Sequence, residues 1–214
     1  MESRKMKKGR LEVICGSMFS GKTEELMRRL KRAEYARQNI LPIKHKFDKR
    51  RSRINISSHD GRERAAFPID GKSVALNKIL ELANSNIDVV GIDEIQFFHS
   101  DIINIICQLV EQGKRVIVAG LDLDFRGEPF GIIPTLLSVA DDVTKLKAIC
   151  VVCSKEAYHT QRIIDGKPAK YDTQTIMVGA EDFYEARCRN CFSIDKNPYL
   201  SKTFIQKKQK QTST

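Results

Sequence analysis

The sequence lacks any long apolar run. No stretch approaches the roughly 20 consecutive apolar residues of a membrane-spanning helix, which argues against a membrane protein. The basic residues 1–10 are not followed by the apolar region of a secretory signal, so we expect no signal peptide and a cytoplasmic location. No internal repeat is present. The 214 residues, 41% hydrophobic and 30% charged, indicate a soluble globular protein with one domain, or with one domain and a small appendage.

Acidic residues are scarce at the two ends of the chain, and these ends account for most of the net charge of +10. Residues 1–10 carry five basic side chains and one acid, residues 201–214 carry four lysines and no acid, and each end therefore contributes +4. The remaining 190 residues net only +2. A nucleic-acid footprint should instead cluster on the folded body, with basic and aromatic side chains interleaved. We therefore expect solubilising tails and no nucleic-acid partner.

Residues 16–23 read Gly-Ser-Met-Phe-Ser-Gly-Lys-Thr, a full match to the phosphate-binding pattern G-x-x-x-x-G-K-[ST]. A strand-like stretch at 11–15 precedes the match and helix formers at 24–32 follow it, so a chance glycine-rich turn is the weaker interpretation. The backbone N–H groups of such a loop converge on phosphate oxygens, and the following helix dipole favours the anion. Lys22 would reach the β- and γ-phosphates, and the Thr23 hydroxyl would bind Mg²⁺.

Apolar runs without strict alternation predict buried parallel strands, and segments with one apolar stripe predict helices between them. Strands are expected at 11–15, 39–43, 87–93, 115–121 and 143–148, and helices at 23–37, 74–85, 100–112 and 134–140. This alternation predicts an α/β fold of the P-loop NTPase (RecA-like) class, a parallel sheet flanked by helices, with a small zinc-binding domain added. The predicted parts are a basic tail (1–10), an ATP-binding domain (11–146), a zinc domain (147–195) and a basic, disordered tail (196–214).

Residues 88–94 form an apolar strand that ends in two carboxylates, about 70 residues after Lys22. In P-loop enzymes an Asp at the end of a neighbouring strand helps to hold Mg²⁺, and Asp93 fits that role. The adjacent Glu94 would point toward the reacting groups, where a Glu can act as a general base. Two ordinary acids at a solvated strand end are the alternative, which the intact glycine loop disfavours. Together the motifs indicate transfer of the γ-phosphoryl of ATP, to water or to a substrate hydroxyl.

Four of the six cysteines form two C-x-x-C pairs with 34 residues between them: Cys150, Cys153, Cys188 and Cys191. Four thiolates give tetrahedral Zn²⁺ a closed shell, so this pattern predicts a structural zinc site, with disulfides or a redox pair as alternatives. Between the pairs, 157–164 and 171–178 are predicted strands of a hairpin-like insert whose turn is 165–167. Cys15 and Cys107 are expected to be small core residues.

Several of these stretches resemble one known family. Residues 16–26 are similar to the phosphate loop of the type II thymidine kinases, 93–98 resemble that family's D-E-x-Q-F-F, and 120–131 resemble its L-D-x-x-F…P-F-G segment. The two cysteine pairs fall where the family's zinc ligands fall, and the likeness runs over residues 11–192. An Ile at position 95, four Cys where some members carry a His, and a Thr at the end of the glycine loop are departures that leave the implied chemistry unchanged.

The resemblance implies transfer of the γ-phosphoryl of ATP to the 5′-hydroxyl of thymidine, and of deoxyuridine, in nucleotide salvage. Glu94 would be the catalytic base, and Lys22 and Arg50 would stabilise the charge that develops on the phosphates. The implied Mg²⁺ ligands are Thr23, Asp93 and Asp48, the last of which lies with Arg50 in a D-x-R match. The implied ATP-binding residues are Gly16, Ser17, Met18, Phe19, Ser20, Gly21, Lys22, Thr23, Asp93, Glu94, Ile95 and Gln96.

The same resemblance implies an acceptor pocket. Aromatic and aliphatic side chains would form its walls, and backbone groups of a loop between the cysteine pairs would hydrogen-bond the pyrimidine. This loop would lie over the substrate as a lasso that zinc holds at its base. The implied substrate-binding residues are Met18, Phe97, Leu121, Phe125, Phe130, Thr160, Met177, Val178, Gly179 and Tyr184. The family also implies a homotetramer and feedback inhibition by TTP.

Two other functions stay open on the residues alone. A P-loop ATPase could act on nucleic acid through a zinc ribbon, although the nearly neutral body of the chain argues against this. A nucleotide-dependent switch would be a second possibility, and it would not need Glu94. Without the resemblance, Phe97, Phe125 and Phe130 would be interpreted as core aromatics.

Overall fold

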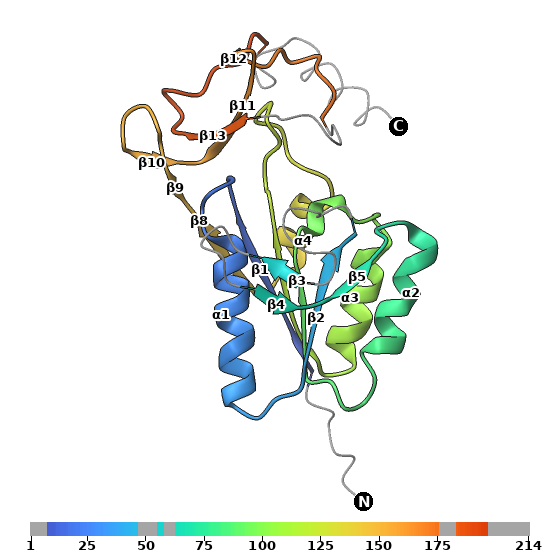
Figure 1. Ribbon diagram of the computed structural model, residues 1–214. Coiled ribbons are helices and arrows are strands. Elements are labelled where there is room, and N and C mark those ends of the chain that lie inside the picture. The colour runs from blue at the N-terminus through green and yellow to red at the C-terminus, as the bar shows by residue number, and fades with distance from the viewer. Residues whose placement is uncertain (1–7, 47–54, 58–62, 176–182, 197–214) are drawn as a thin grey trace, which may run out of the picture.

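The computed structural model describes residues 8–46, 55–57, 63–175 and 183–196 (Figure 1). Its centre is a six-stranded sheet in which every neighbouring pair is parallel. In spatial order the strands are β5 (Phe67–Ile69), β2 (Ile40–His45), β6 (Val89–Ile92), β7 (Arg115–Gly120), β1 (Arg10–Gly16) and β8 (Asp142–Leu146). The predicted α/β class with a parallel sheet is confirmed.

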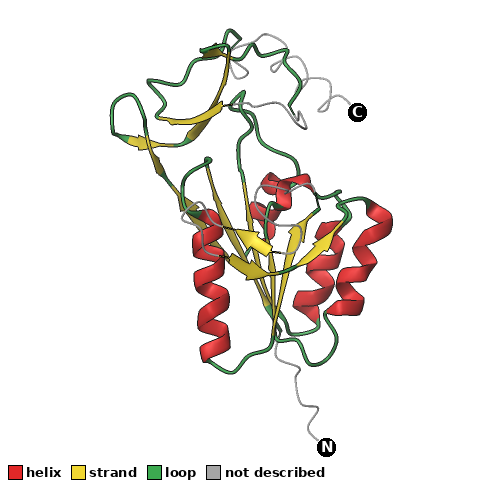
Figure 2. Ribbon diagram, viewed as in Figure 1, coloured by secondary structure: helices red, strands yellow, loops and turns green. Residues whose placement is uncertain are grey.

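Helices cover both faces of this sheet (Figure 2). α1 (Lys22–Tyr35) packs on one face, while α2 (Ser73–Leu82), α3 (Ile102–Glu111) and α4 (Ile133–Val139) pack on the other. On β1, Val13 and Cys15 belong to the core beneath α3 and α4, whereas Ile14 belongs to the core beneath α1. Because both faces are buried, the strands read as continuous apolar runs, and this is why the sequence indicates them without alternation.

The chain leaves the sheet after β8 and forms a second unit, which we call the cysteine module. It contains β9 (Ala148–Ile149), β10 (Glu156–Ala157), β11 (His159–Ile164), β12 (Lys167–Pro168) and β13 (Phe183–Arg187). β9 pairs with β10, and β11 lies between β12 and β13 in an antiparallel sheet. In Figure 1 this module lies above the sheet, beyond the carboxyl ends of β1 and β7. The predicted division into domains stays a prediction.

The predicted turn of the insert is confirmed, but the predicted second strand at 171–178 is wrong over the residues that the structure describes, and 176–178 lie outside them. Asp165 and Gly166 have φ of 49° and 71° and close a two-residue hairpin between β11 and β12. β12 ends at Pro168, and one more hydrogen bond follows it, in which the Ala169 N–H donates to the Arg162 carbonyl oxygen at 2.9 Å. Residues 171–175 form a turn and bends, and the Tyr171 N–H donates to the Asp195 carboxylate at 2.7 Å. The main partner of β11 is β13 instead.

Before α2, three short strands were not predicted. β3 (Asn55–Ser57) and β4 (Glu63–Ala65) pair antiparallel, and β5 adds an edge to the main sheet. Each has three residues, which is too short to produce a periodic apolar pattern. Cys107 is also corrected, because it lies exposed on the outer side of α3, whereas Cys15 is in the core as expected. None of the described helices combines the length and apolar content needed to cross a membrane.

Candidate active site and metal centre

The glycine loop joins β1 to α1 and depends on two glycines for its path. Gly16 has a φ of 141°, and a Cβ there would lie 2.3 Å from the Leu146 carbonyl oxygen on β8. Gly21 has a φ of 84° and precedes the first residue of α1. L side chains rarely adopt these backbone conformations, so both positions require glycine. The loop therefore passes close to β8 and places the N-terminus of α1 at the carboxyl edge of the sheet.

Internal hydrogen bonds hold the loop in shape. The Ser20 hydroxyl donates to the Ser17 carbonyl oxygen at 2.8 Å, and the Lys22 Nζ donates to the same oxygen at 2.7 Å. Lys22 is thus folded back across the loop that precedes it. Its ammonium lies where it can exchange a carbonyl partner for an anionic one.

An acidic residue from a different strand meets the first turn of α1. The Thr23 hydroxyl donates to Oδ2 of Asp93 at 3.1 Å, a contact between residues 70 positions apart. Asp93 follows β6 and is only 4% exposed, and its Oδ1 accepts the Glu94 N–H at 3.0 Å. β7 lies between β1 and β6 in the sheet, so this contact crosses one strand. The structure brings together two of the residues predicted to hold Mg²⁺, and hydroxyl and carboxylate oxygens are ligands that this ion prefers.

Glu94 has an unusual backbone conformation. Its φ of 53° is left-handed, which is uncommon for a residue other than glycine, and it precedes the short 3-10 helix η1 (Ile95–Phe97). The Gln96 amide nitrogen donates to the Glu94 carboxylate, and the Gln96 Oε1 accepts the Leu121 N–H at 3.1 Å. Gln96 therefore joins the end of β6 to the end of β7. Strained backbone of this kind clusters at functional sites.

Two glycines make room for Gln96. A Cβ on Gly120 would lie 2.5 Å from its side-chain oxygen, and a Cβ on Gly131 would lie 2.6 Å from its carbonyl oxygen. The sequence predicted Gln96 as an ATP-binding residue by resemblance alone. Its bridge between Glu94 and Leu121 is a role that sequence reasoning missed, because the bridge depends on contacts between two loops.

The four paired cysteines come together in the cysteine module. Their sulfur atoms all lie within 4.8 Å of one another, and Sγ of Cys153 and Sγ of Cys188 are 3.5 Å apart. Tetrahedral Zn²⁺ with sulfur ligands near 2.3 Å would place its sulfurs about 3.8 Å apart. All six cysteines of the chain are free, so the disulfide alternative is not realised. The donor set could hold a zinc ion.

Backbone amides around the sulfurs favour this interpretation. Burial alone would raise the pKa of Cys150, but backbone N–H groups, led by that of Cys188, outweigh it and lower the pKa to about 6. Contacts with the Cys188 and Cys153 sulfurs raise the pKa of Cys191 to about 12, since a further thiolate would add to the charge. A dication would offset part of the negative charge that opposes the last thiolate, so this pattern of pKa values agrees with a metal site.

The residues predicted to bind the acceptor come from both parts of the chain. Thr160 on β11 contacts the glycine loop, because its hydroxyl oxygen accepts the Met18 N–H at 3.0 Å. Phe97 and Phe130 meet edge to face, with ring centroids 5.8 Å apart. Leu121 follows β7, and Tyr184 lies on β13, where it pairs with Arg162. Phe125 is 4% exposed, and its ring lies beneath the guanidinium groups of Arg126 and Arg162.

Five predicted residues lie outside the described part of the chain: Asp48, Arg50, Met177, Val178 and Gly179. Their roles therefore stay predictions.

An ion pair beside the glycine loop, in which a buried carboxylate meets a half-exposed ammonium, was not predicted from the sequence. Asp122, 5% exposed, follows β7 and contacts the Lys145 ammonium on β8 at 2.7 Å. Burial, with a smaller contribution from Asp122, raises the pKa of the Cys15 thiol to about 11, which keeps it protonated at neutral pH. This ion pair could not be predicted, because its two residues belong to different strands and no local sequence pattern indicates which strands lie close together.

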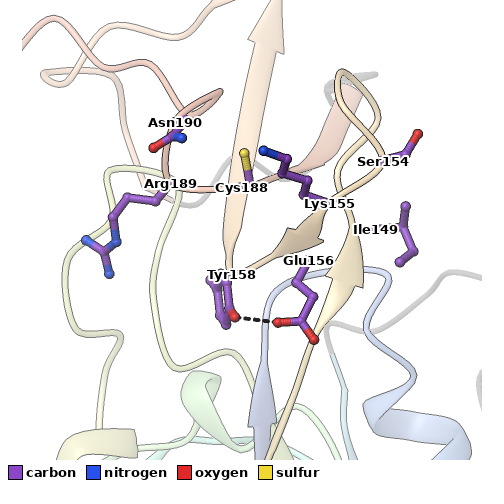
Figure 3. Close-up of a pocket in the computed structure, with 8 residues that line it drawn as sticks. All are labelled: Ile149, Ser154, Lys155, Glu156, Tyr158, Cys188, Arg189 and Asn190. Atoms are coloured by element: carbon purple, nitrogen blue, oxygen red, sulfur yellow. Dashed lines mark hydrogen bonds between the residues drawn. The ribbon is translucent and has the colours of Figure 1, made fainter.

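An open depression of about 540 Å³ lies on the cysteine module (Figure 3). Tyr158 and Glu156 line it and are joined by a hydrogen bond of 2.7 Å, with Lys155 and Arg189 on its rim. None of its lining residues comes from the glycine loop or from the end of β6. The depression is therefore separate from the candidate active site.

The chain matches the thymidine kinase family over residues 9–192, which covers most of the described structure. This family implies ATP and thymidine as substrates, and its activity is a phosphoryl transfer. The glycine loop, the Thr23–Asp93 contact and the cluster of four cysteines agree with that match. The chain belongs to the thymidine kinase family and is an ATP-dependent kinase.

Proposed function

We propose that the protein transfers the γ-phosphoryl of ATP to the 5′-hydroxyl of thymidine, and of deoxyuridine, to give the nucleoside monophosphate and ADP. The observation that carries this proposal is the contact between Thr23 and Asp93, with Glu94 next in the chain. It brings the phosphate-binding loop and an acidic pair to one edge of the sheet. The chain would thereby serve nucleotide salvage.

The donor half of the site would use the glycine loop. Backbone N–H groups of residues 16–23 would bind the phosphates of ATP, and Lys22 would exchange its bond with the Ser17 carbonyl for one with a phosphate oxygen. Thr23 and Asp93 would hold Mg²⁺, with Asp48 as a further ligand. When bound, this ion would neutralise charge on the β- and γ-phosphates.

Glu94 would act as the general base. Its carboxylate would take the proton of the acceptor 5′-hydroxyl while that oxygen bonds to the γ-phosphorus and the bond to the β-phosphate oxygen of ADP breaks. Gln96 supports this role, since its amide nitrogen donates to Oε2 of Glu94 and so helps to orient the carboxylate. Arg50 and Lys22 would stabilise the charge that develops on the transferred group.

The acceptor half would use both parts of the chain. Phe97, Leu121, Phe125 and Phe130 would provide apolar walls, with Met18 and Thr160 near the base and Tyr184 on the sugar side. Met177, Val178 and Gly179 would supply the backbone groups that read the pyrimidine edge. A zinc ion bound by four cysteines has no open position, so its role would be to hold this part of the chain in shape.

The resemblance further supports a homotetramer that TTP inhibits. It also supports the proposed division of labour, with residues 11–146 binding ATP and 147–195 closing over the acceptor.

A substrate screen tests the proposal. Purified protein would be given ATP and Mg²⁺ with each of the four deoxynucleosides, with deoxyuridine, with single-stranded DNA or with no acceptor. We expect nucleoside monophosphate from thymidine and deoxyuridine, and no product from Lys22→Met. ATP hydrolysis that single-stranded DNA stimulates, without any nucleoside product, would contradict the proposal and favour a nucleic-acid ATPase.

A further inference from the structure

The strand β11 presents different partners on its two faces, because successive side chains of a strand point in opposite directions. One face contacts the end of the cysteine module. The His159 ring stacks on Phe192 with centroids 4.5 Å apart, and the Gln161 Oε1 accepts the Ser193 N–H at 2.8 Å. The opposite face carries Thr160, which contacts the glycine loop, and two residues further on, Arg162.

Arg162 is fully buried, which is rare for an arginine. Its guanidinium lies over the Phe125 ring, 5.5 Å from the centroid, and Nη1 donates to the Gln174 carbonyl oxygen at 2.7 Å. Burying this charge carries a desolvation cost that only well-placed partners offset. The ring of Phe125 and the Gln174 carbonyl therefore help to stabilise the buried guanidinium of Arg162.

Arg126 approaches the same ring from the loop that follows β7. Its guanidinium lies 5.3 Å from the Phe125 centroid and 5.2 Å from that of Tyr171, and Nη2 donates to the Thr173 carbonyl oxygen at 2.8 Å. Two arginines from different elements thus lie over one phenylalanine. They also bind two consecutive carbonyl groups, those of Thr173 and Gln174, in the segment 170–175.

The loop that carries Arg126 is itself held in shape. Oδ1 of Asp124 accepts the N–H groups of Arg126 and Glu128 at 2.8 and 3.0 Å. The Tyr171 hydroxyl donates to the Glu128 carboxylate, so this turn and the segment 170–175 make a second connection. The position of the segment relative to Phe125 is therefore specified from both sides.

We propose that Arg126 and Arg162 are positioning residues for the acceptor nucleoside. They hold the segment 170–175 of the cysteine module against Phe125 and so set the spacing between the two halves of the acceptor site. This inference rests on the proposed function, in which Phe125 and Thr160 contact the nucleoside. It differs from a catalytic role, because neither guanidinium needs to touch the phosphates or the reacting hydroxyl.

The test compares Arg126→Lys and Arg162→Lys with Arg187→Lys as the matched control. Lysine keeps the positive charge but lacks the planar guanidinium, which can stack on an aromatic ring and donate several hydrogen bonds in a fixed geometry. Arg187 lies on β13 of the same sheet and pairs with Glu185. We expect KM for thymidine to rise about tenfold in the first two variants, since each loses a ring contact and a charged hydrogen bond. KM for ATP and kcat at saturating thymidine should stay within about twofold of the wild type.

An unchanged KM for thymidine in both variants would overturn the inference. A parallel rise in KM for ATP, together with lost zinc or a lower melting temperature, would overturn it as well, because the arginines would then serve stability alone. Arg126 is only partly buried, so its variant remains informative if Arg162→Lys does not fold. Failure of the proposed function is distinguishable, since the wild type would then give no thymidine product at all.

Discussion

The parallel sheet and the cysteine module are stabilised in different ways. The sheet buries two continuous layers of Ile, Leu and Val side chains against helices on both faces. The apolar cluster of the cysteine module consists of three alanines and two of the cysteines, with a third cysteine beside it. Three alanines bury little area, and the hydrophobic effect scales with that area. A small unit of this kind needs a cross-link, and the four cysteines could supply one by binding a metal ion.

The two regions also differ in what they bury. β1, β6 and β7 bury almost only apolar side chains, whereas β11 buries the successive polar residues from His159 to Arg162. Each of these polar groups contacts a specific partner, which makes the module's position sensitive to geometry more than to apolar volume. The sheet therefore depends mainly on apolar packing, whereas the position of the module depends on specific polar contacts.

Loss of a metal from the four cysteines should give the largest difference between the two regions, measured as the affinity for each substrate. Cys188→Ser, or a chelator added to the wild type, should weaken thymidine binding on the order of 100-fold while ATP binding changes little, because the module loses its cross-link. Calorimetric titration with each ligand measures both affinities. Cys107→Ser is the matched control, since Cys107 is exposed on α3. Equal loss of both affinities would show that the sheet depends on the module.

A cavity in the core of the sheet should lower the stability of the sheet and leave the metal content of the cysteine module unchanged. Leu30 on α1 is fully buried between the helix and the sheet, so Leu30→Ala should lower the free energy of unfolding by about 3 kcal/mol. Zinc content should not change. Denaturant unfolding and metal analysis of the same sample check both statements. Zinc loss at denaturant concentrations too low to unfold the protein would show that the cysteine module depends on the core of the sheet.

Acid should weaken the sheet through a buried carboxylate. Burial alone would raise the pKa of Glu12 on β1, but hydrogen bonds from Arg115 and Arg29 outweigh it and hold the pKa below the ordinary 4.5. A carboxyl group whose pKa is lower in the folded state than in the unfolded state stabilises the fold at pH values above the unfolded-state pKa. This stabilisation is lost as the pH falls through the folded-state pKa. The protection factors of the amides in β1 and α1, which correct for the intrinsic pH dependence of exchange, should therefore fall below about pH 4.5. The acid dependence should be weaker in Glu12→Gln, and an identical profile would rule Glu12 out.

The sheet could be predicted because its signals are local. A strand buried on both faces is apolar throughout, and the glycine loop needs a fixed order of residue types within eight positions. The cysteine pairs were equally clear, since two ligands with two residues between them can share one turn. The four sulfurs then meet as the spacing implies.

The remaining features depend on contacts between distant segments. The pairing of β11 with β13 and the burial of Arg162 appear only when the chain has folded, because their partners lie in other loops. Cys107 was misjudged because apolar neighbours on α3 do not reveal which face of the helix it occupies. The left-handed backbone of Glu94 and its bond with Gln96 follow from packing between the ends of β6 and β7.

The most direct test of the account is the turnover of Glu94→Gln beside Glu81→Gln, an exposed glutamate on α2. The amide keeps the size of the side chain but cannot accept the proton of the acceptor hydroxyl. We predict that ATP binding is retained while kcat for thymidine phosphorylation falls by a factor of about 10² to 10⁴, and that Glu81→Gln behaves as the wild type. Thymidine phosphorylation at a near-normal rate in Glu94→Gln would contradict the account.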